Sequence, residues 1–465
     1  MSASSPTADQ FESAVQQSLQ AHFNDLSAIS QEIWSHPETG YQEHHAVQQL
    51  TDYMEKIGYQ VTRKFCDIET SFLGEYQTPG FDAAKHPTVA VLCEYDALPD
   101  IGHGCGHNLI AIVGLGAFLA AAEVLKAAGS AAQGRIVCMG APAEELGGGK
   151  VLLLESGAFK GVDYALMSHP APVDVLEPSI LSIDHCQAEF YGKAAHASCG
   201  PWEGVNALDA VIAAYNNVSM LRQQLKPGHQ IHMIIKNGGA KPNIIPEYTK
   251  AEIYIRAPTS ADVDELRTRV AACMHAGAEA TGCRVECGLN DLSYSGLMSN
   301  QKLLSIYKHF GEKNGMRFMI LPPGAYGSTD MGNVSTTIPS IHPGFCIGDP
   351  HCTMIHTREF RDSVGKPVAN HFAMKSAAAL ALTALELFSN PDFRKDVQTE
   401  FDQRRPVFMG KAATEGTDMT DSVDGTLQLP SGFNPDRRRS SRQFLIDMGL
   451  LKPSLLEQKR DSIQE

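Results

Sequence analysis

The chain has 465 residues, of which 43% are hydrophobic and 20% charged, and this length exceeds what one hydrophobic core usually serves, which predicts two domains and a tail. Its 53 Asp and Glu residues outnumber its 38 Lys and Arg residues, and the net charge of -15 argues against nucleic acid or an anionic membrane surface as the main partner. No apolar run reaches the length of a membrane span, and the polar residues 1–20, which we expect to be flexible, resemble no secretory signal. Eleven cysteines without a C-x-x-C pair suit a reducing compartment, so we expect a soluble, cytoplasmic protein.

The first part of the chain alternates helices and strands. Apolar residues recur at helical spacing between Phe23 and Ile33, and a short apolar run from Val89 to Cys93 predicts a buried strand. In chain order there follow a Gly- and His-rich loop over 102–107, a helix over about 109–128, a strand over 135–140, a short helix near 151–154 and a strand over 163–168. This order predicts an α/β domain with a mostly parallel central sheet flanked by helices. Ligands of such sheets gather at the carboxyl ends of the strands.

From about residue 184 the predicted order changes to β-α-β-β-α-β, which is that of a ferredoxin-like α+β unit. Strict alternation supports its strands, because Ala251, Ile253 and Ile255 face one way and their polar neighbours face the other. After about Leu297 the chain returns to helix and strand. We therefore predict a discontinuous first domain over 21–183 and 297–390, an inserted domain over 184–296 and a polar tail over 391–465. A regulatory basic patch at 437–439 is the alternative to a merely solvated tail.

The loop that follows the first buried strand holds three side chains capable of binding a metal, His103, Cys105 and His107. Its glycines allow the backbone to bend around an ion. Cys105 and His107 are two residues apart, so both could converge on one site, whereas we expect His103 to lie behind the ligands. A turn with incidental polar residues is the alternative, and the combination of Cys and His with glycines favours a metal site.

Two adjacent carboxylates, Glu144 and Glu145, follow the strand over 135–140. Adjacent carboxylates in apolar surroundings repel each other and need a positive charge or a proton to coexist. If a metal supplies that charge, one glutamate can bind it while the other takes a proton from water, which is the division of labour that metal-assisted hydrolysis requires. A Glu pair alone is most often a solvated surface, and its position at a strand end is what favours a site.

His169 comes at the end of the next predicted strand, where the sheet rule again points to the ligand-binding edge. A lone histidine there would more often be structural, but three successive strand ends offer possible ligands. A further group lies late in the chain and contains His342, His351 and His356. Spacing alone does not select among these three.

These segments resemble the M20 family of metallopeptidases and amidohydrolases, in the branch of aminobenzoyl-glutamate hydrolase and of peptidase M20 domain-containing protein 2. The resemblance spans roughly residues 20 to 390 and combines motif with matching context. The segments that carry it are W-S-H-P-E-T-G from Trp34, D-A-L-P from Asp96, G-C-G-H-N from Gly104, P-A-E-E-L-G-G-G from Pro142 and G-K-A-A-H-A-S-C-G-P-W-E-G-V-N-A-L-D-A from Gly192.

The resemblance implies two divalent metal ions, zinc or manganese, between a catalytic α/β domain and a smaller lid or dimerisation domain. It implies Glu144 as the general base and Asp96 as a carboxylate that orients a ligand. It assigns five metal ligands, with His356 as the last because M-I-H-T matches the family's closing histidine motif: Cys105, His107, Glu145, His169 and His356. Relatives that act on acylated amino acids commonly carry aspartate where this chain has Asn108, which changes the charge near the metals.

In the predicted lid, His196 resembles the histidine that reaches the scissile carbonyl in this family, often from the partner subunit of a dimer. Asn243 and Arg256 resemble the residues that hold the carboxylate of the substrate, a task that suits the planar fork of arginine. The alternative for His196 is a histidine that merely lies in a turn. The alternative for Arg256 is a structural salt bridge with Glu252.

The sequence thus predicts a metal-dependent amide hydrolase, in which Glu144 deprotonates a water held between two metals and His196 steadies the oxyanion. The expected substrate is a small, peptide-like molecule with a free carboxylate, and resemblance favours a dipeptide with a basic C-terminal residue. The resemblance further implies a homodimer that forms through the lid. An aminoacylase or aminobenzoyl-glutamate-type amidohydrolase is one alternative, and a catalytically inactive, metal-binding regulatory partner is another.

Overall fold

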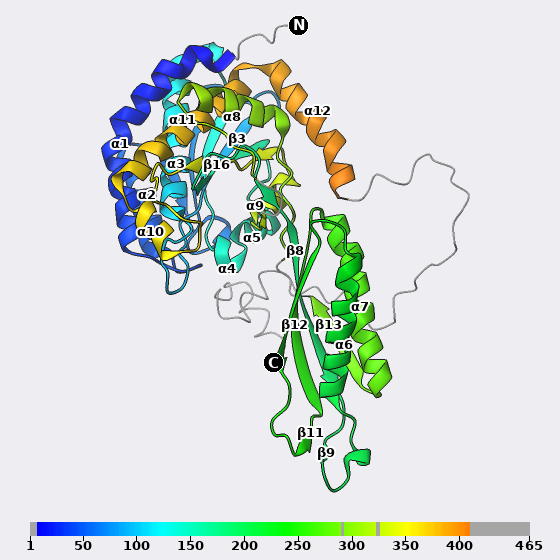
Figure 1. Cartoon of the computed structure of the whole chain (residues 1–465). Helices are drawn as coiled ribbons and strands as arrows, with labels where there is room; N and C mark the ends of the chain where they lie inside the picture. Colours follow the sequence, from blue (N-terminus) through cyan, green and yellow to red (C-terminus); the bar gives the residue numbers. More distant parts are fainter. Residues whose placement is uncertain (1–6, 290–292, 322–325, 410–465) are drawn as a thin grey trace, which may run out of the picture. The chain divides into compact units, whose positions relative to one another are not determined.

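The computed structural model describes residues 7–289, 293–321 and 326–409. These residues form two compact units, seen in Figure 1. The first combines residues 7–179 with residues 297–405, and the second combines Ile180–Gly296 with residues 406–409. The second unit therefore interrupts the first along the chain, and it begins at Ile180 rather than at residue 184. The predicted basic patch at 437–439 lies outside the described residues.

Among the described residues, the central sheet of the first unit has six strands in the order β1-β2-β4-β3-β5-β15. Their bounds are β1 (Gln60–Arg63), β2 (Phe72–Gln77), β3 (Thr88–Cys93), β4 (Arg135–Gly140), β5 (Tyr164–Leu166) and β15 (Ser340–Ile341). Strands β4, β3, β5 and β15 pair in parallel, whereas β1 and β2 add an antiparallel edge. The α/β class with a mostly parallel sheet is confirmed, and the two antiparallel strands are an addition to it. β3 is buried along its whole length, which requires cover on both faces.

Shorter strands extend this unit beyond the central sheet. Strand β6 (His169–Ala171) pairs in parallel with β16 (Gly344–Cys346). The remaining short strands are β7 (Ser179–Ile180) and β14 (Tyr326–Gly327). Because β6 follows β5 after only two residues, it carries the chain just past the carboxyl end of the central sheet, where a ligand site is expected.

The helices of the first unit supply most of its core. They are η1 (Thr7–Phe11), α1 (Glu12–Ser35), α2 (His44–Lys56), η2 (Phe65–Asp67), α3 (His107–Ala128), η3 (Gly129–Ala131), α4 (Glu144–Gly147), α5 (Gly149–Glu155), α8 (Gln301–Lys313), α9 (Met331–Ser335), α10 (Arg358–Val364), α11 (Pro367–Ser389) and α12 (Pro391–Phe408). Helix α3 contacts α1 and α11 as well as strands β3 and β4. The sequence expectation that no run reaches membrane-spanning length is wrong for α3 and α11, which are long and apolar enough. Their most apolar windows are 94% and 83% buried inside the structure, so their apolar character serves the core.

Two terminal segments that we predicted to be flexible or loosely docked are ordered helices. Residues 7–20 belong to η1 and α1, where Ala8 and Val15 are fully buried, so the prediction of a flexible segment is wrong for them. The N–H of Ala8 donates a hydrogen bond of 2.7 Å to the buried carboxylate of Glu386 in α11. The predicted tail begins with helix α12, which buries Val397 and Phe401. This polar helix buries only these two residues, which is why its sequence resembles a solvated tail.

The second unit is a four-stranded antiparallel sheet with two helices, among the described residues. Its elements are β8 (Ser182–Tyr191), β9 (Ala195–His196), η4 (Pro201–Glu203), α6 (Ala207–Leu221), η5 (Arg222–Gln224), β10 (Gln230–Asn237), β11 (Ile244–Ile245), β12 (Tyr248–Ala257), α7 (Ser260–Thr281) and β13 (Arg284–Leu289). The sheet order β10-β12-β8-β13 is that of a ferredoxin-like unit, as predicted. Helices α6 and α7 pack against each other and against β8 and β12. In this sheet order, β10 and β13 are the two edge strands.

Candidate metal centre

The carboxyl ends of two neighbouring parallel strands bring acidic side chains together. Strands β3 and β4 pair in parallel with Cys93 opposite Gly140, so both end at the same edge of the sheet. Glu94 and Asp96 follow β3 directly, and α4 begins with the two glutamates four residues after β4 ends. This edge therefore collects carboxylates from segments that lie about fifty residues apart in the sequence.

The loop before α3 turns two possible ligands toward this edge. Gly106, between Cys105 and His107, has a φ of 82°, which is a left-handed conformation that favours glycine. A Cβ atom at this position would lie 2.7 Å from Cγ of Pro170, so only glycine lets the loop approach so closely. His107 is then the first residue of α3, and it is fully buried.

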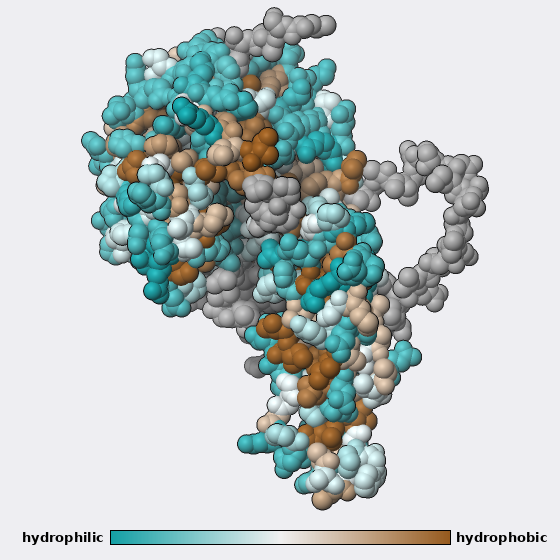
Figure 2. Space-filling view, viewed as in Figure 1, coloured by the Kyte–Doolittle hydropathy of each residue, from teal (hydrophilic) through white to brown (hydrophobic). Residues whose placement is uncertain are grey.

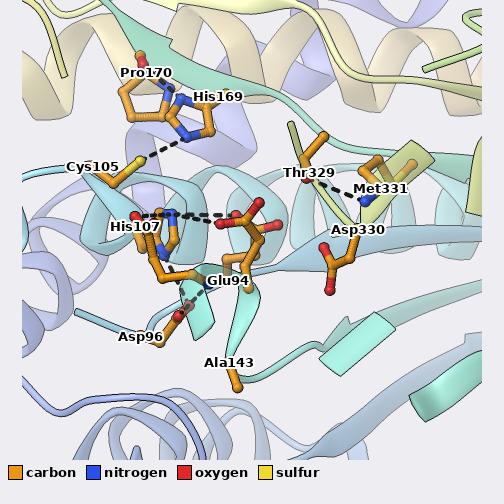
Figure 3. A network of polar contacts seen from close by, with 12 residues as sticks. Glu94, Asp96, Cys105, His107, Ala143, His169, Pro170, Thr329, Asp330 and Met331 are labelled. Carbon is orange, nitrogen blue, oxygen red and sulfur yellow. Dashed lines mark hydrogen bonds and ion pairs between the residues drawn. The ribbon is translucent and has the colours of Figure 1, made fainter. Parts of the chain in front are cut away.

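His107 lies at the centre of the cluster, as Figure 3 shows. Its Nδ1 hydrogen-bonds Oδ1 of Asp96 at 2.9 Å, which turns Nε2 toward the other acids. Nε2 lies 3.6 Å from Glu94 Oε2, 3.9 Å from Glu145 Oε1 and 4.0 Å from Glu144 Oε2. No described residue hydrogen-bonds Nε2. Because a ligating histidine is usually oriented by a carboxylate on its other nitrogen, this arrangement is the one that a metal ligand requires.

Cys105 and His169 lie next to each other beside His107, as Figure 3 also shows. Sγ of Cys105 lies 3.3 Å from Nε2 of His169. The Nδ1 atom of His169 donates a hydrogen bond of 2.7 Å to the carbonyl of Pro170, and this leaves Nε2 without a proton. Burial lowers the pKa of His169 to about 4, so that its ring is neutral near pH 7 and can act as a ligand.

Glu145 and His356 are a further pair of neighbouring ligand candidates. Nε2 of His356 lies 3.3 Å from Oε1 of Glu145. Of the three late histidines, the structure places only His356 in a ligand group among the described residues. His342 is buried with its ring centroid 5.7 Å from that of His169, and His351 is exposed. The spatial arrangement thus separates three candidates that spacing in the sequence did not.

The backbone is strained where the site is assembled. Ala143 and His356 have φ values of 57° and 65°, although neither is a glycine. The N–H of Ala143 donates a hydrogen bond of 2.8 Å to the buried carboxylate of Glu43, which stabilises the sharp turn into α4. Residues in the left-handed region cost free energy and persist where surrounding contacts hold them, often at functional sites.

The charge balance of the cluster favours a cation. Burial raises the pKa of Glu144 well above its usual range, and the charges of Glu94 and Glu145 raise it further. Burial also raises the pKa of the Cys105 thiol. These groups can all be ionised together only if positive charge is added, which is the role a divalent metal fills for a thiolate and carboxylates.

The donor set fits metal ions. Three groups of residues in this cluster have their ligand atoms within 4.8 Å of one another: Cys105, His107 and His169, then Cys105, Glu145 and His356, then Glu94, His107 and Glu144. Two ligand atoms of one tetrahedral zinc ion are roughly 3.4 Å apart. The two 3.3 Å separations at His169 and His356 match that value. Buried atoms of His107 and Glu145 that lack hydrogen-bond partners among the described residues point the same way.

The other residues named from the sequence lie apart from this cluster or behind it. His103 is buried and belongs to no ligand group of the described residues. Asn108 is also buried, and its Nδ2 donates hydrogen bonds to Oγ of Ser30 at 3.0 Å and to the carbonyl of Val364. The amide at Asn108 therefore ties α3 to α1 and α10, and an aspartate could not donate these bonds.

The predicted lid residues all lie in the second unit. His196 is exposed in β9, opposite Ile244 of β11, and Asn243 directly precedes β11. The carbonyl of Asn243 accepts a hydrogen bond of 3.1 Å from the N–H of Ala197, so the two predicted residues belong to one tip of the unit. Arg256 lies partly buried on β12, and Glu252, its suggested salt-bridge partner, pairs with Lys236 at 3.3 Å.

Sequence reasoning overlooked a buried charge network beside the cluster. Nζ of Lys150 contacts Oε1 of Glu94 and lies 2.6 Å from Oδ1 of Asp330. All three side chains are buried. A signal for Glu94 was present, because it precedes Asp96 by two residues at a strand end and alternate residues share a face.

We expect Asp96→Asn to weaken metal binding by about 10–100-fold, because Asp96 orients two proposed ligands. Its Oδ1 accepts from His107, and its Oδ2 accepts from the N–H of Glu145 at 3.0 Å. An asparagine can accept only one of these two bonds. Competition with a chromogenic chelator measures the affinity. Asp163→Asn, which alters a carboxylate at the opposite end of β3, is the control, and equal affinity in the two variants would contradict the prediction.

The chain thus combines an α/β unit, which carries a cluster of metal-type donors at its strand ends, with an inserted ferredoxin-like unit, and its relatives place it among the hydrolases. The family model for the M20 peptidase dimerisation domain matches residues 182–281. The Xaa-Arg dipeptidase of Mus musculus is 41% identical over 384 residues, which cover 81% of this chain and 88% of that protein. The chain therefore belongs to the M20 peptidase family, as the sequence resemblance indicated.

Two further relatives agree with this assignment. One of the subunits of the p-aminobenzoyl-glutamate hydrolase of Escherichia coli (strain K12) is 27% identical over 466 residues, which cover 84% of this chain and 94% of that protein. Among solved structures, a dinuclear metal binding peptidase of the M20 family from Bacillus subtilis has a TM-score of 0.61 at 18% identity. The match covers 79% of this chain and 99% of that chain, and it shows a shared fold.

Proposed function

We propose that the chain is a metal-dependent dipeptidase whose substrate has a basic C-terminal residue and a free carboxylate. The observation that carries this proposal is the meeting of five metal-type donors from distant segments beside Glu144: Cys105, His107, Glu145, His169 and His356. The Xaa-Arg dipeptidases of Mus musculus and Homo sapiens, at 41% and 39% identity, support the substrate class. The acidic net charge of the chain is compatible with a basic substrate.

The side chains of the cluster divide the chemistry among them. Divalent ions held by the five donors would polarise the scissile carbonyl and lower the pKa of a water molecule. Glu144, which follows the strained Ala143, would accept a proton from that water and deliver it to the leaving amine. Hydrolysis then adds one water across the amide bond and yields a carboxylate and an amine.

His196 is proposed to steady the carbonyl oxygen as negative charge develops on it. Its Nδ1 accepts hydrogen bonds of 3.3 Å from the N–H groups of Ser198 and Cys199. An Nδ1 that accepts leaves the proton on Nε2, which can then donate to an oxyanion. Asn243 and Arg256 are proposed to hold the substrate carboxylate, a group that the guanidinium fork of arginine matches well.

Zinc is the metal that the donor set favours over manganese. A thiolate and three imidazoles are soft or intermediate ligands that suit zinc, whereas manganese prefers carboxylate and water oxygens. We propose two ions, because the donors form two ligand groups, each of which includes Cys105. Metal analysis of the purified protein by mass spectrometry gives the identity and the stoichiometry, and a single ion per chain would contradict the two-ion proposal.

A substrate panel on one metal-analysed preparation tests the function. Dipeptides that end in Arg or Lys, dipeptides that end in neutral residues, N-acetyl amino acids and aminobenzoyl-glutamate are compared by kcat/KM. We expect the basic dipeptides to be the best substrates. A higher kcat/KM for aminobenzoyl-glutamate would favour the second candidate, the activity named for the Escherichia coli relative. Hydrolysis of none of these substrates by the metal-loaded protein would overturn the proposal.

We further propose that the chain is a homodimer that forms through edge strand β10 and helix α6 of the second unit. Figure 2 shows hydrophobic residues gathered over the strands of this unit. The large hydrophobic side chains that β10 and α6 leave exposed are Ile212, Tyr215, Met220, Ile234 and Ile235. An edge strand offers unpaired backbone groups that a second copy can pair with, and the matched dimerisation domain includes both elements.

Replacing Ile235 and Met220 by Lys is expected to convert the dimer into a monomer, because each subunit would bury two desolvated charges at the interface. Size-exclusion chromatography with light scattering measures the mass. Ile320→Lys, which changes a 99% exposed residue of the first unit, should leave the dimer intact. A dimer that survives the double substitution would place the interface elsewhere.

We propose the cytoplasm as the location of the protein. All eleven cysteines fall within the described residues, and each is a free thiol. A reducing compartment preserves such thiols, including the Cys105 side chain that the metal centre requires. Thiol titration of the unfolded, freshly purified protein should therefore find eleven reactive groups.

A further inference from the structure

The two carboxylate oxygens of Glu94 have unequal surroundings. Oε1 contacts the ammonium of Lys150, whereas Oε2 has no hydrogen-bond partner among the described residues. The side chain is 1% exposed, so water does not solvate Oε2 from outside. A buried carboxylate oxygen without a partner is costly, and one that persists indicates a missing ligand.

A ring nitrogen beside this oxygen also lacks a hydrogen-bond partner among the described residues. Oε2 lies 3.6 Å from Nε2 of His107, and neither atom has a hydrogen-bond partner among the described residues. This separation is close to the roughly 3.4 Å between two ligands of one tetrahedral ion. Glu94, His107 and Glu144 also form a ligand group of their own, with all ligand atoms within 4.8 Å. Figure 3 shows the Glu94 side chain directed at the His107 ring.

The charges of Glu94 and its neighbours Lys150 and Asp330 do not balance. The ammonium of Lys150 contacts both Glu94 and Asp330. Oδ2 of Asp330 also accepts a hydrogen bond of 2.8 Å from the backbone N–H of Lys150. One ammonium between two carboxylates leaves one negative charge uncompensated. A buried charge is tolerated when it is paired or coordinates a metal.

We propose that Glu94 is a ligand of the metal centre, and that it shares through Oε2 the ion held by His107. Lys150 and Asp330 position it, because they fix Oε1 and leave Oε2 facing the histidine. Glu94 thereby adds an anionic oxygen to a nitrogen and sulfur donor set, which strengthens the binding of one of the two ions. This inference rests on the proposed metal-dependent function and names a ligand beyond the five that function requires.

The test is metal binding by the full chain with Glu94→Gln, followed with Co²⁺ as a spectroscopic probe. Metal-free protein is titrated with Co²⁺ while the visible absorption bands are recorded. We expect one of the two Co²⁺ ions to bind about 10–100-fold more weakly, with a changed band intensity, and the other to bind as in the unsubstituted protein. Asp163→Asn is the control, because it changes a carboxylate at the opposite end of β3, outside the Glu94 network, and it should keep both bands.

A second variant covers the case in which Glu94→Gln fails to fold. Glu94→Asp keeps a negative charge near Lys150, but its shorter side chain withdraws an oxygen from His107, so we expect the same selective loss of one ion. Unchanged affinity and bands for both ions in these variants would overturn the inference. Equal weakening of both ions in parallel with a lower melting temperature would also overturn it, because that pattern marks a structural role. If the unsubstituted chain binds no Co²⁺ or Zn²⁺, the proposed function itself fails.

Discussion

Replacing Glu144 by Gln is expected to lower kcat/KM for dipeptide hydrolysis by about 10²–10⁴-fold, the usual contribution of a general base. The amide has nearly the same shape as the carboxylate but cannot accept the proton of the attacking water. Glu144 follows directly after the strained turn at Ala143, and the burial of its carboxylate raises its pKa. A carboxylate that holds a proton more tightly than usual is a stronger base, so its loss removes a step that solvent does not replace.

The measurement pairs kinetics with metal content, because only the combination separates the roles of the two adjacent glutamates. Glu144→Gln should retain both ions, whereas Glu145→Gln should lose activity and at least one ion together. The distinction arises because Glu145 Oε1 lies 3.3 Å from His356, as two ligands of one ion would. Loss of metal from both variants alike would show that Glu144 is a ligand, and full activity of Glu144→Gln would remove it from the mechanism.

The central strands and the ligand-bearing loops could be predicted because their signals are local. β3 is an uninterrupted apolar run, and the residues that follow it are glycines with Cys and His, a pattern that few structural segments need. The rule that ligands gather at carboxyl ends of parallel strands then brought Cys105, the pair Glu144 and Glu145, and His169 together from the sequence alone, whereas the choice of Glu145 as the ligand came from the family resemblance. The first edge strand lacked such a signal, because β1 has four largely exposed residues, three of them polar.

The remainder of the site depends on contacts between distant segments, which no local pattern records. Lys150 and Asp330 are separated by 180 residues, and each alone resembles a solvated charge. His356 could not be separated from His342 and His351 by spacing, because it is carried by an irregular loop with a positive φ rather than by a strand end. Its assignment came from family resemblance, and its contact with Glu145 is a tertiary fact.

Replacing Lys150 by Met is expected to lower the free energy of unfolding of the first unit by about 3–5 kcal/mol, because removal of one partner leaves buried charges uncompensated. Burial alone would lower the pKa of Lys150, but the charges of Asp330 and Glu94 raise it above its usual value, so the ammonium stays charged. Its side chain has no exposed surface. Met fills a similar volume, and the expected loss therefore reports charge rather than a cavity.

Urea unfolding followed by the fluorescence of Trp34 measures this loss, in a Trp202→Phe background so that the signal comes from the first unit. The two tryptophans are the only ones in the chain, and Trp34 is anchored by a hydrogen bond of 2.8 Å to the carbonyl of Arg361. The triple variant Lys150→Met, Glu94→Gln, Asp330→Asn should recover much of the loss, because it replaces buried ions by neutral groups. Lys308→Met, which breaks an exposed pair with Glu312, should cost less than about 1 kcal/mol. If the triple variant were no more stable than Lys150→Met alone, the loss would come from packing, and the role of Lys150 as the counter-charge of Glu94 would be wrong.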